Sequence, residues 1–242
     1  MPTESGDRKV IDNYRQIIDH VTADANYNPA HPLITKIALA AHHTAASAAD
    51  DATDSAAAPY KMAVNARQEV FGPLSTLIRR SFAMMKASGA SQGELDDAQT
   101  EVRKITGTRK SPKKKADPNT PAAEADKQHS ASQMSFANRR GNVGAYVETL
   151  ANVPSYNPNE NELKLASMQA LVADLDDKNN AVSAAFVPLS QARGARDGIL
   201  YLDEDSVVNR AALIKAYVQA AFGRDSQLYK AIKGLEFKRQ NR

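Results

Sequence analysis

The chain contains two similar stretches at a fixed separation, and this repeat constrains the fold more than any other feature. Residues 18–21 lead to Tyr27-Asn28-Pro29, and residues 147–150 lead to Tyr156-Asn157-Pro158, with each matched pair 129 residues apart. Similarity at a constant offset is typical of a duplicated structural unit. The sequence therefore predicts two similar halves joined by a linker.

A second set of matching residues follows each turn. Tyr60 with Asn65-Ala66-Arg67 resembles Phe186 with Gln191-Ala192-Arg193 at an offset of 126, so the first copy would carry three extra residues. An arginine beside an apolar stripe can lay its stem over a core and direct its guanidinium at a carboxylate or a helix end. Two interpretations stay open. One is a structural pair within each half, and the other is a shared anion or peptide pocket built from Asn65, Arg67, Gln191 and Arg193.

The composition predicts an all-α fold. Much of the 42% apolar fraction is alanine, the best helix former, and β-branched and aromatic residues are sparse. The residues Met168, Leu175, Val182 and Leu189 recur every seven positions, which predicts one long helix over about 159–201. Proline inside a helix bends or interrupts it. We therefore expect two pseudo-symmetric helical-bundle halves with long helices kinked at Pro59 and Pro188.

The charge distribution predicts three parts. Residues 1–106 hold 11 basic and 13 acidic side chains, residues 107–134 hold 6 and 3, and residues 135–242 hold 14 and 12. We assign these ranges to a first helical repeat, a flexible basic linker and a second helical repeat, because the middle range lacks the apolar groups that offset the entropy of ordering. Its basic residues form either a solvated run or phosphate contacts to nucleic acid: Arg109, Lys110, Lys113, Lys114 and Lys115.

The sequence offers no recognisable catalytic or cofactor-binding motif. The absence of cysteine excludes disulfides, thiol catalysis and cysteine-bound metals. The five histidines lack the convergent spacing of a metal site, and no phosphate-binding loop or nucleophile elbow occurs. We therefore expect no cofactor, metal site or catalytic residue, and a non-enzymatic role is favoured. The polar start and the absence of any run near 20 apolar residues predict a cytoplasmic protein without a membrane span.

Several short motifs in order resemble a family of helical proteins of unknown activity found mainly in Bacteroidetes. The motifs are Tyr156-Asn157-Pro158-Asn159-Glu160, Asn65-Ala66-Arg67, residues 86–91 followed by Asp96-Asp97-Ala98, and Tyr217-Val218 leading to Phe222-Gly223. The resemblance covers most of the chain outside the linker, although residues 39–58 have fewer leucines than the family pattern. It implies an all-helical tandem repeat and brings no activity, cofactor or catalytic residue.

Three functional hypotheses follow. The first is a non-catalytic helical scaffold or protein-interaction module, based on the repeat, the long helices and the lack of a catalytic set. The alternative is a nucleic-acid-associated accessory protein that uses the basic linker and the C-terminal tail. The third is an enzyme whose pocket and perturbed carboxylates the sequence does not reveal. The sequence identifies neither a ligand nor a partner.

Overall fold

The computed structural model describes residues 6–108 and 134–238, and within these ranges every regular element is helical, which confirms the all-α prediction. The first range begins with α1 (Asp7–Ala23) and a short 3-10 turn, η1 (Pro32–Ile34). The long helix α2 (Lys36–Phe71), α3 (Leu74–Ala87) and α4 (Gln92–Thr106) follow. Gly72 and Pro73 separate α2 from α3.

The second described range repeats this order of elements. It contains α5 (Phe136–Ala151), the 3-10 turn η2 (Asn161–Leu163), the long helix α6 (Leu165–Asp197), α7 (Val207–Phe222) and α8 (Gln227–Ile232). A π-helical segment, η3 (Gly198–Leu202), lies between α6 and α7. The predicted helix over 159–201 is therefore too long at both ends, because η2 occupies its start and the π-helical segment its end.

The chain forms two compact units. Unit 1 combines residues 1–61 with 184–242, and unit 2 comprises residues 62–183. The divisions fall inside α2 and α6, so each long helix contributes to both units. The predicted ranges 1–106 and 135–242 were defined by sequence similarity. Each compact unit contains helices from both of these ranges. Those repeat boundaries, with the linker 107–134 between them, stay a prediction.

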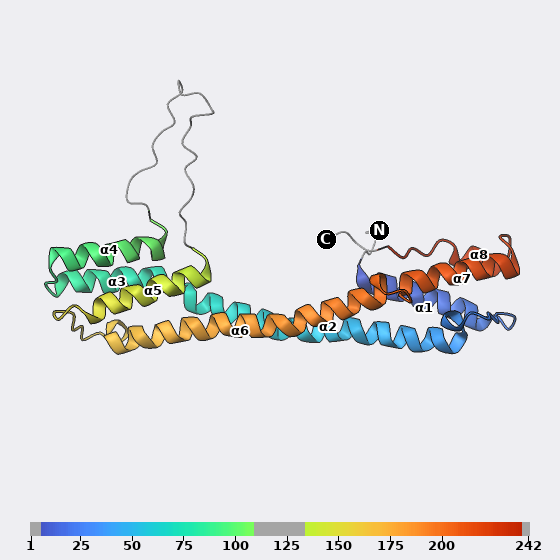
Figure 1. The fold of residues 1–242 in the computed structure, drawn as a ribbon, viewed down its shortest axis with the longest axis horizontal. Helices are drawn as coiled ribbons and strands as arrows, with labels where there is room; N and C mark the ends of the chain where they lie inside the picture. Colours follow the sequence, from blue (N-terminus) through green and yellow to red (C-terminus); the bar gives the residue numbers. More distant parts are fainter. Residues whose placement is uncertain (1–5, 109–133, 239–242) are drawn as a thin grey trace, which may run out of the picture. The chain divides into compact units, whose positions relative to one another are not determined.

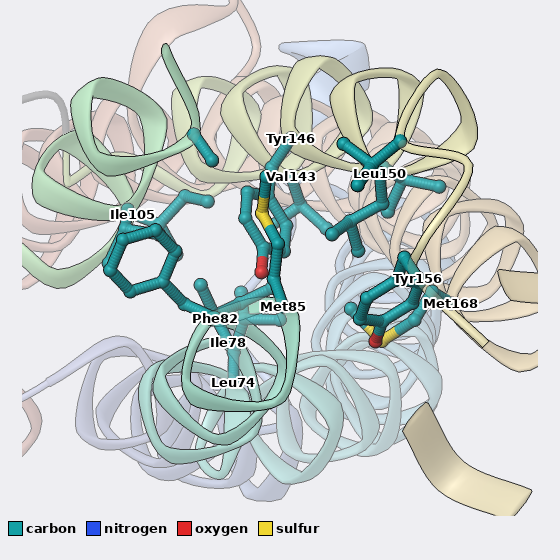
Figure 2. Close-up of a cluster of buried hydrophobic side chains, with 14 of the residues drawn as sticks. Leu74, Ile78, Phe82, Met85, Ile105, Val143, Tyr146, Leu150, Tyr156 and Met168 are labelled. Carbon is teal, nitrogen blue, oxygen red and sulfur yellow. The ribbon is translucent and has the colours of Figure 1, made fainter. Parts of the chain in front are cut away.

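In unit 2, α5 lies alongside α3 and α4 (Figure 1). Figure 2 shows side chains from these three helices and from the start of α6 pointing toward one another. The buried apolar residues at helical spacing on α3 are Leu74, Ile78, Phe82 and Met85. They meet Tyr146 and Leu150 of α5 and Ile105 of α4 in one cluster. Burial of such side chains contributes about 1.5–3 kcal/mol each.

In unit 1, α1 lies beside α7 and α8 (Figure 1). The buried face of α1 carries Val10, Ile11, Tyr14, Ile17, Ile18 and Val21, which recur at helical spacing. It packs in one cluster with Leu39 of α2, Ile214 and Val218 of α7 and Ile232 of α8. This core covers the first helix of the chain with its last helices.

The two Tyr-Asn-Pro turns have the same internal hydrogen bond. The Tyr27 hydroxyl donates to the Ile34 carbonyl at 2.9 Å, and the Tyr156 hydroxyl donates to the Leu163 carbonyl at 2.7 Å. Both rings are buried. Each tyrosine therefore fixes the turn that leads into a long helix, as expected for a buried ring that anchors a turn.

The internal prolines do not interrupt the long helices. Pro59 lies inside α2 and Pro188 inside α6, and both helices continue beyond them, although some helices of the structure are bent. A proline removes one backbone hydrogen bond and crowds the preceding turn. At Pro59 the residues before the proline are mostly alanine and serine, which are small, and α2 continues to Phe71; a kink at this residue stays a prediction.

Candidate functional site

A group of buried and half-buried charged contacts in unit 1 surrounds Arg196, at the end of α6. Arg196 is 7% exposed, and its Nη1 lies 2.9 Å from Asp7 Oδ2. Its Nη2 donates to Asp197 Oδ1 at 2.9 Å. The Tyr201 hydroxyl donates to the other oxygen of Asp7 at 2.9 Å. We call Asp7, Arg196, Asp197 and Tyr201 the Arg196 cluster.

Local structure explains how these four side chains converge. Asp7 is the first residue of α1, where the positive end of the helix dipole favours a carboxylate. Tyr201 lies in the π-helical segment, whose wider turn differs from the α-helix before it. At the start of this segment, a Cβ on Gly198 would come within 3.2 Å of the Asp203 carboxylate. Glycine therefore permits the close approach of residue 203.

The Arg196 cluster has the electrostatics of a closed structural network. Burial alone would lower the pKa of Arg196, but the contacts with Asp197 and Asp7 raise it above its usual value. Burial, followed by the hydrogen bond to Asp7, raises the pKa of Tyr201. The ion pair between Arg196 and Asp7 joins α6 to α1.

An acidic row on α2 borders this cluster. Arg8 Nε donates to Asp50 Oδ2 at 3.3 Å, and Arg8 Nη2 donates to Asp54 Oδ2 at 3.2 Å. Asp51 lies 3.9 Å from the same guanidinium. Within residues 6–108 and 134–238, no group of three or more histidine, aspartate or glutamate side chains has the geometry to hold a metal ion. The acidic row therefore pairs with an arginine.

A second polar centre in unit 1 lies between α1, α2 and α7. The rings of Tyr14 and His42 meet edge to face with centroids 5.7 Å apart. The Tyr14 hydroxyl and His42 Nδ1 are buried and have no hydrogen-bond partner among the described residues. Burial, with the positive charge of Arg210, lowers the pKa of His42 to about 4. This histidine is therefore neutral at pH 7.

Arg210 closes this centre on the side of α7. It is buried, its Nη1 donates to the Leu33 carbonyl at 2.6 Å, and its Nη2 donates to Asp205 Oδ2 at 2.8 Å. The described residues contain three buried charged side chains, Asp50, Arg196 and Arg210, and each has an ion-pair partner. These buried charges are satisfied by protein contacts.

The four residues proposed from the Asn/Gln-Ala-Arg motif lie in different environments. The Arg67 guanidinium lies 3.9 Å from the centroid of the Phe136 ring, in a cation–π contact within unit 2. Asn65, Gln191 and Arg193 are exposed and have no hydrogen-bond or ion-pair partner in the described part of the chain. Arg67 thus has a packing role, and the proposed pocket of all four residues stays a prediction.

The predicted nucleic-acid contacts, Arg109, Lys110, Lys113, Lys114 and Lys115, lie outside the described residues. The final basic residues Arg239 and Arg242 lie outside the described residues as well, and only Lys238 of that tail is described. Its ammonium pairs with Glu236 at 3.5 Å, and both side chains are largely exposed.

Sequence reasoning missed Arg196, and a different alignment of the repeats would have found it. Pro59 and Pro188 are 129 residues apart, the same offset as the tyrosine turns. Continuing this offset pairs Arg67 with Arg196 and Phe71 with Leu200. Phe71 and Leu200 are both buried, as expected if they occupy equivalent core positions in the two repeats. The contacts thus favour 129 throughout the long helices and give no support to the shift to 126.

The contacts of the two arginines agree with this pairing. Arg67 lies over the ring of Phe136, the first residue of α5, and Arg196 pairs with Asp7, the first residue of α1. Asp7 and Phe136 are themselves 129 residues apart. At one position in each long helix, an arginine therefore contacts the start of a short helix, although the chemistry of the contact differs.

Unit 1 exposes a small apolar strip on its long helices. The rings of Tyr60 and Phe186 are 5.7 Å apart, Phe186 is 46% exposed and Val187 is 53% exposed. Pro59 and Pro188 are exposed beside them in sequence. We call Tyr60, Phe186 and Val187 the apolar strip. Aromatic side chains exposed together can contribute to a protein interface.

No family model, curated protein or solved structure matches this chain. Among the described residues, no helix combines the length and the apolar character needed to cross a bilayer.

Proposed function

We propose that the protein is a non-catalytic helical scaffold that binds another protein. The observation that carries this proposal is the apolar strip, in which Phe186 and Val187 are exposed and the Phe186 ring contacts the half-buried ring of Tyr60. The buried charged groups of the described chain are already paired, which also favours a binding role over catalysis. Interfaces are enriched in aromatic anchors surrounded by polar residues.

The test compares two substitutions on the same helix. Immobilised protein carrying Val187→Asp is compared with protein carrying Ser190→Asp, a change at another exposed position of α6. We expect the wild type and Ser190→Asp to retain the same partner proteins from a native lysate, whereas Val187→Asp loses them, because a charge disfavours an apolar contact. Equal recovery with all three proteins would refute the role of the strip.

A second candidate is binding to nucleic acid, favoured by the charge of the linker. Residues 107–134 carry six basic and three acidic side chains, an excess of three positive charges. If Lys113, Lys114 and Lys115 contact phosphates, their joint change to alanine weakens binding to a mixed-sequence duplex. It also flattens the salt dependence by roughly three units of slope. Absence of binding by the wild type at low salt eliminates this candidate.

We also infer that the two halves arose by duplication and are pseudo-symmetric. The inference is supported by the repeated order of elements, the shared tyrosine hydrogen bond and the two prolines at the same offset. A crystal structure in which residues 36–71 are superposed on residues 165–200 tests it. Poor overlap of Arg67 with Arg196 would contradict a constant offset.

We further propose that the chain belongs to the Bacteroidetes family that it resembles, and that it acts in the bacterial cytoplasm. The ordered motifs support the first statement, and a chain without cysteine is compatible with a reducing compartment. Cell fractionation with an antibody against the protein tests the second. Recovery in the periplasmic fraction would contradict it.

A further inference from the structure

Each compact unit is completed by segments from both halves of the chain. Unit 2 combines α3, α4 and the end of α2 from the first half with α5, η2 and the start of α6 from the second. Unit 1 combines α1, η1 and the start of α2 with the end of α6, α7 and α8. The exchange is reciprocal, because each half gives its beginning to one unit and its end to the other.

In unit 2, buried hydroxyl groups and rings join the two halves. The Tyr146 hydroxyl donates to Ser81 Oγ at 3.1 Å, and the Ser81 and Tyr156 hydroxyls are hydrogen-bonded at 2.9 Å. The rings of Phe71 and Phe136 meet edge to face with centroids 4.9 Å apart. The Ser81 side chain is fully buried on α3, so its hydroxyl cannot bond to water. Its hydrogen-bond partners must come from the second half or from its own helix.

In unit 1, buried polar groups of both halves depend on each other. Arg210 Nη1 donates to the Leu33 carbonyl at 2.6 Å, and Asn13 Nδ2 donates to the Glu236 carbonyl at 2.8 Å. The rings of Tyr27 and Tyr217 meet edge to face with centroids 5.2 Å apart. A buried donor without a hydrogen-bond partner lowers the stability of the folded protein. These contacts therefore favour packing of the second half over α1 and η1.

Neither half can cover its own buried surface in this arrangement. The buried face of α1 packs with α7 and α8, while the α3–α4 hairpin of the same half packs with α5. The two ends of one half belong to different units, so a lone half retains two incomplete cores. Apolar faces of this kind associate with the partner that completes them.

We propose that each half of the chain is a binding partner for the other half: residues 6–108 present two docking surfaces that residues 134–238 fill, without needing a covalent connection. A second copy of the chain carries the same surfaces, so halves can also be exchanged between copies. This inference rests on the contacts within each unit and is independent of the proposed scaffold function.

The test keeps the full chain and cuts it after folding. A protease recognition sequence is inserted between Ala122 and Ala123, in the predicted linker. The folded protein is cleaved, and its mass is measured by size-exclusion chromatography with light scattering. We expect the two fragments to elute together with the mass of one chain and with unchanged helical circular dichroism. Fragments that elute separately, whether folded or unfolded, overturn the proposal, and so does a soluble aggregate.

Dilution provides a second measurement that distinguishes bound halves from independent domains. If the fragments hold each other, the urea midpoint of the cleaved protein falls on tenfold dilution, while the midpoint of the uncut protein is unchanged. If each fragment is an independent domain, cutting and dilution leave the midpoint unchanged, and the proposal is wrong. The inserted but uncut protein is the matched control for the insertion itself.

A substitution at the interface sharpens the same comparison. Arg210→Met removes the donor to Leu33, and Arg224→Met changes an exposed arginine near the end of α7. We expect Arg210→Met to lower the urea midpoint of the cleaved protein, measured at one fixed concentration, more than Arg224→Met does. Equal behaviour of the two variants would mean that the Arg210 contact does not hold the halves together.

Discussion

Removing the buried histidine of unit 1 should change how stability depends on pH. His42 is 9% exposed, and burial, followed by Arg210, lowers its pKa from 6.5 to about 4. Asp205 and Asp203 act in the opposite direction, and His43 acts with Arg210. In the unfolded chain the imidazole returns to its ordinary value. Between these two values the unfolded chain binds a proton that the folded protein does not.

The sign and size of the effect follow from this difference. Stability contributed by neutral His42 is fully present above about pH 6.5 and is lost as the pH falls toward 4. One pKa unit corresponds to about 1.4 kcal/mol, so the loss in the free energy of unfolding reaches at most about 3 kcal/mol. Below the folded pKa, both states bind the proton and the difference no longer grows.

The substitution His42→Leu removes this titration. Leucine was chosen because position 171, which corresponds to position 42 at the offset of 129, carries a leucine that packs against the core of unit 2. Urea unfolding at pH 7, 6, 5 and 4 measures the free energy of unfolding of both proteins. We expect the wild type to lose more stability than His42→Leu over this range, by up to about 3 kcal/mol.

A matched histidine provides the control. His20 lies on α1 and is exposed, so His20→Gln is the matched substitution of a histidine outside the core. Parallel curves for the wild type and His42→Leu would refute the reasoning, because they would mean that position 42 binds protons equally in the folded and unfolded states.

Three further predictions concern packing, turns and the linker. Leu175→Ala should reduce stability by about 2–5 kcal/mol and Val182→Ala by less, measured by urea unfolding, because both side chains are buried and their truncation leaves a cavity. Tyr156→Phe should cost about 1–3 kcal/mol by the same assay, because Ser81 and the Leu163 carbonyl lose a buried partner. Replacing residues 107–130 with a Gly/Ser linker of equal length should leave the thermal midpoint nearly unchanged; a drop of many degrees would contradict their predicted role as a flexible linker.

Helix positions were largely predictable because they depend on local patterns. The apolar spacing of residues 7–23, followed by Asn26 to Pro29, predicts the first helix, and α1 has these bounds. Serine favours the N-cap position and glycine the end of a helix, and α7 is capped by Ser206 and followed by Gly223. In these segments the local propensity and the final packing favour the same structure.

The partners of the helices were not predictable in the same way. Periodicity shows which face of α1 is apolar, but not that α7 and α8 cover it. Likewise, a short Asn/Gln-Ala-Arg match drew attention to Arg193, which is exposed, and away from Arg196, which is buried and paired with Asp7. A three-residue match carries less information than a constant spacing sustained over a whole helix.

The reciprocal exchange of segments also determines which compact unit has all its helices first during synthesis. Residues 62–183 are contiguous, so all the segments of unit 2 are available once α6 has been made. Unit 1 instead joins the first helix to the last, and α1 precedes α7 by roughly 200 residues of translation. At about 5–20 residues per second, the apolar face of α1 stays uncovered on the nascent chain for about 10–40 s. The apolar face of α1 therefore depends on α7 and α8, and a chain truncated within α7 would have all the segments of unit 2 but an uncovered core in unit 1.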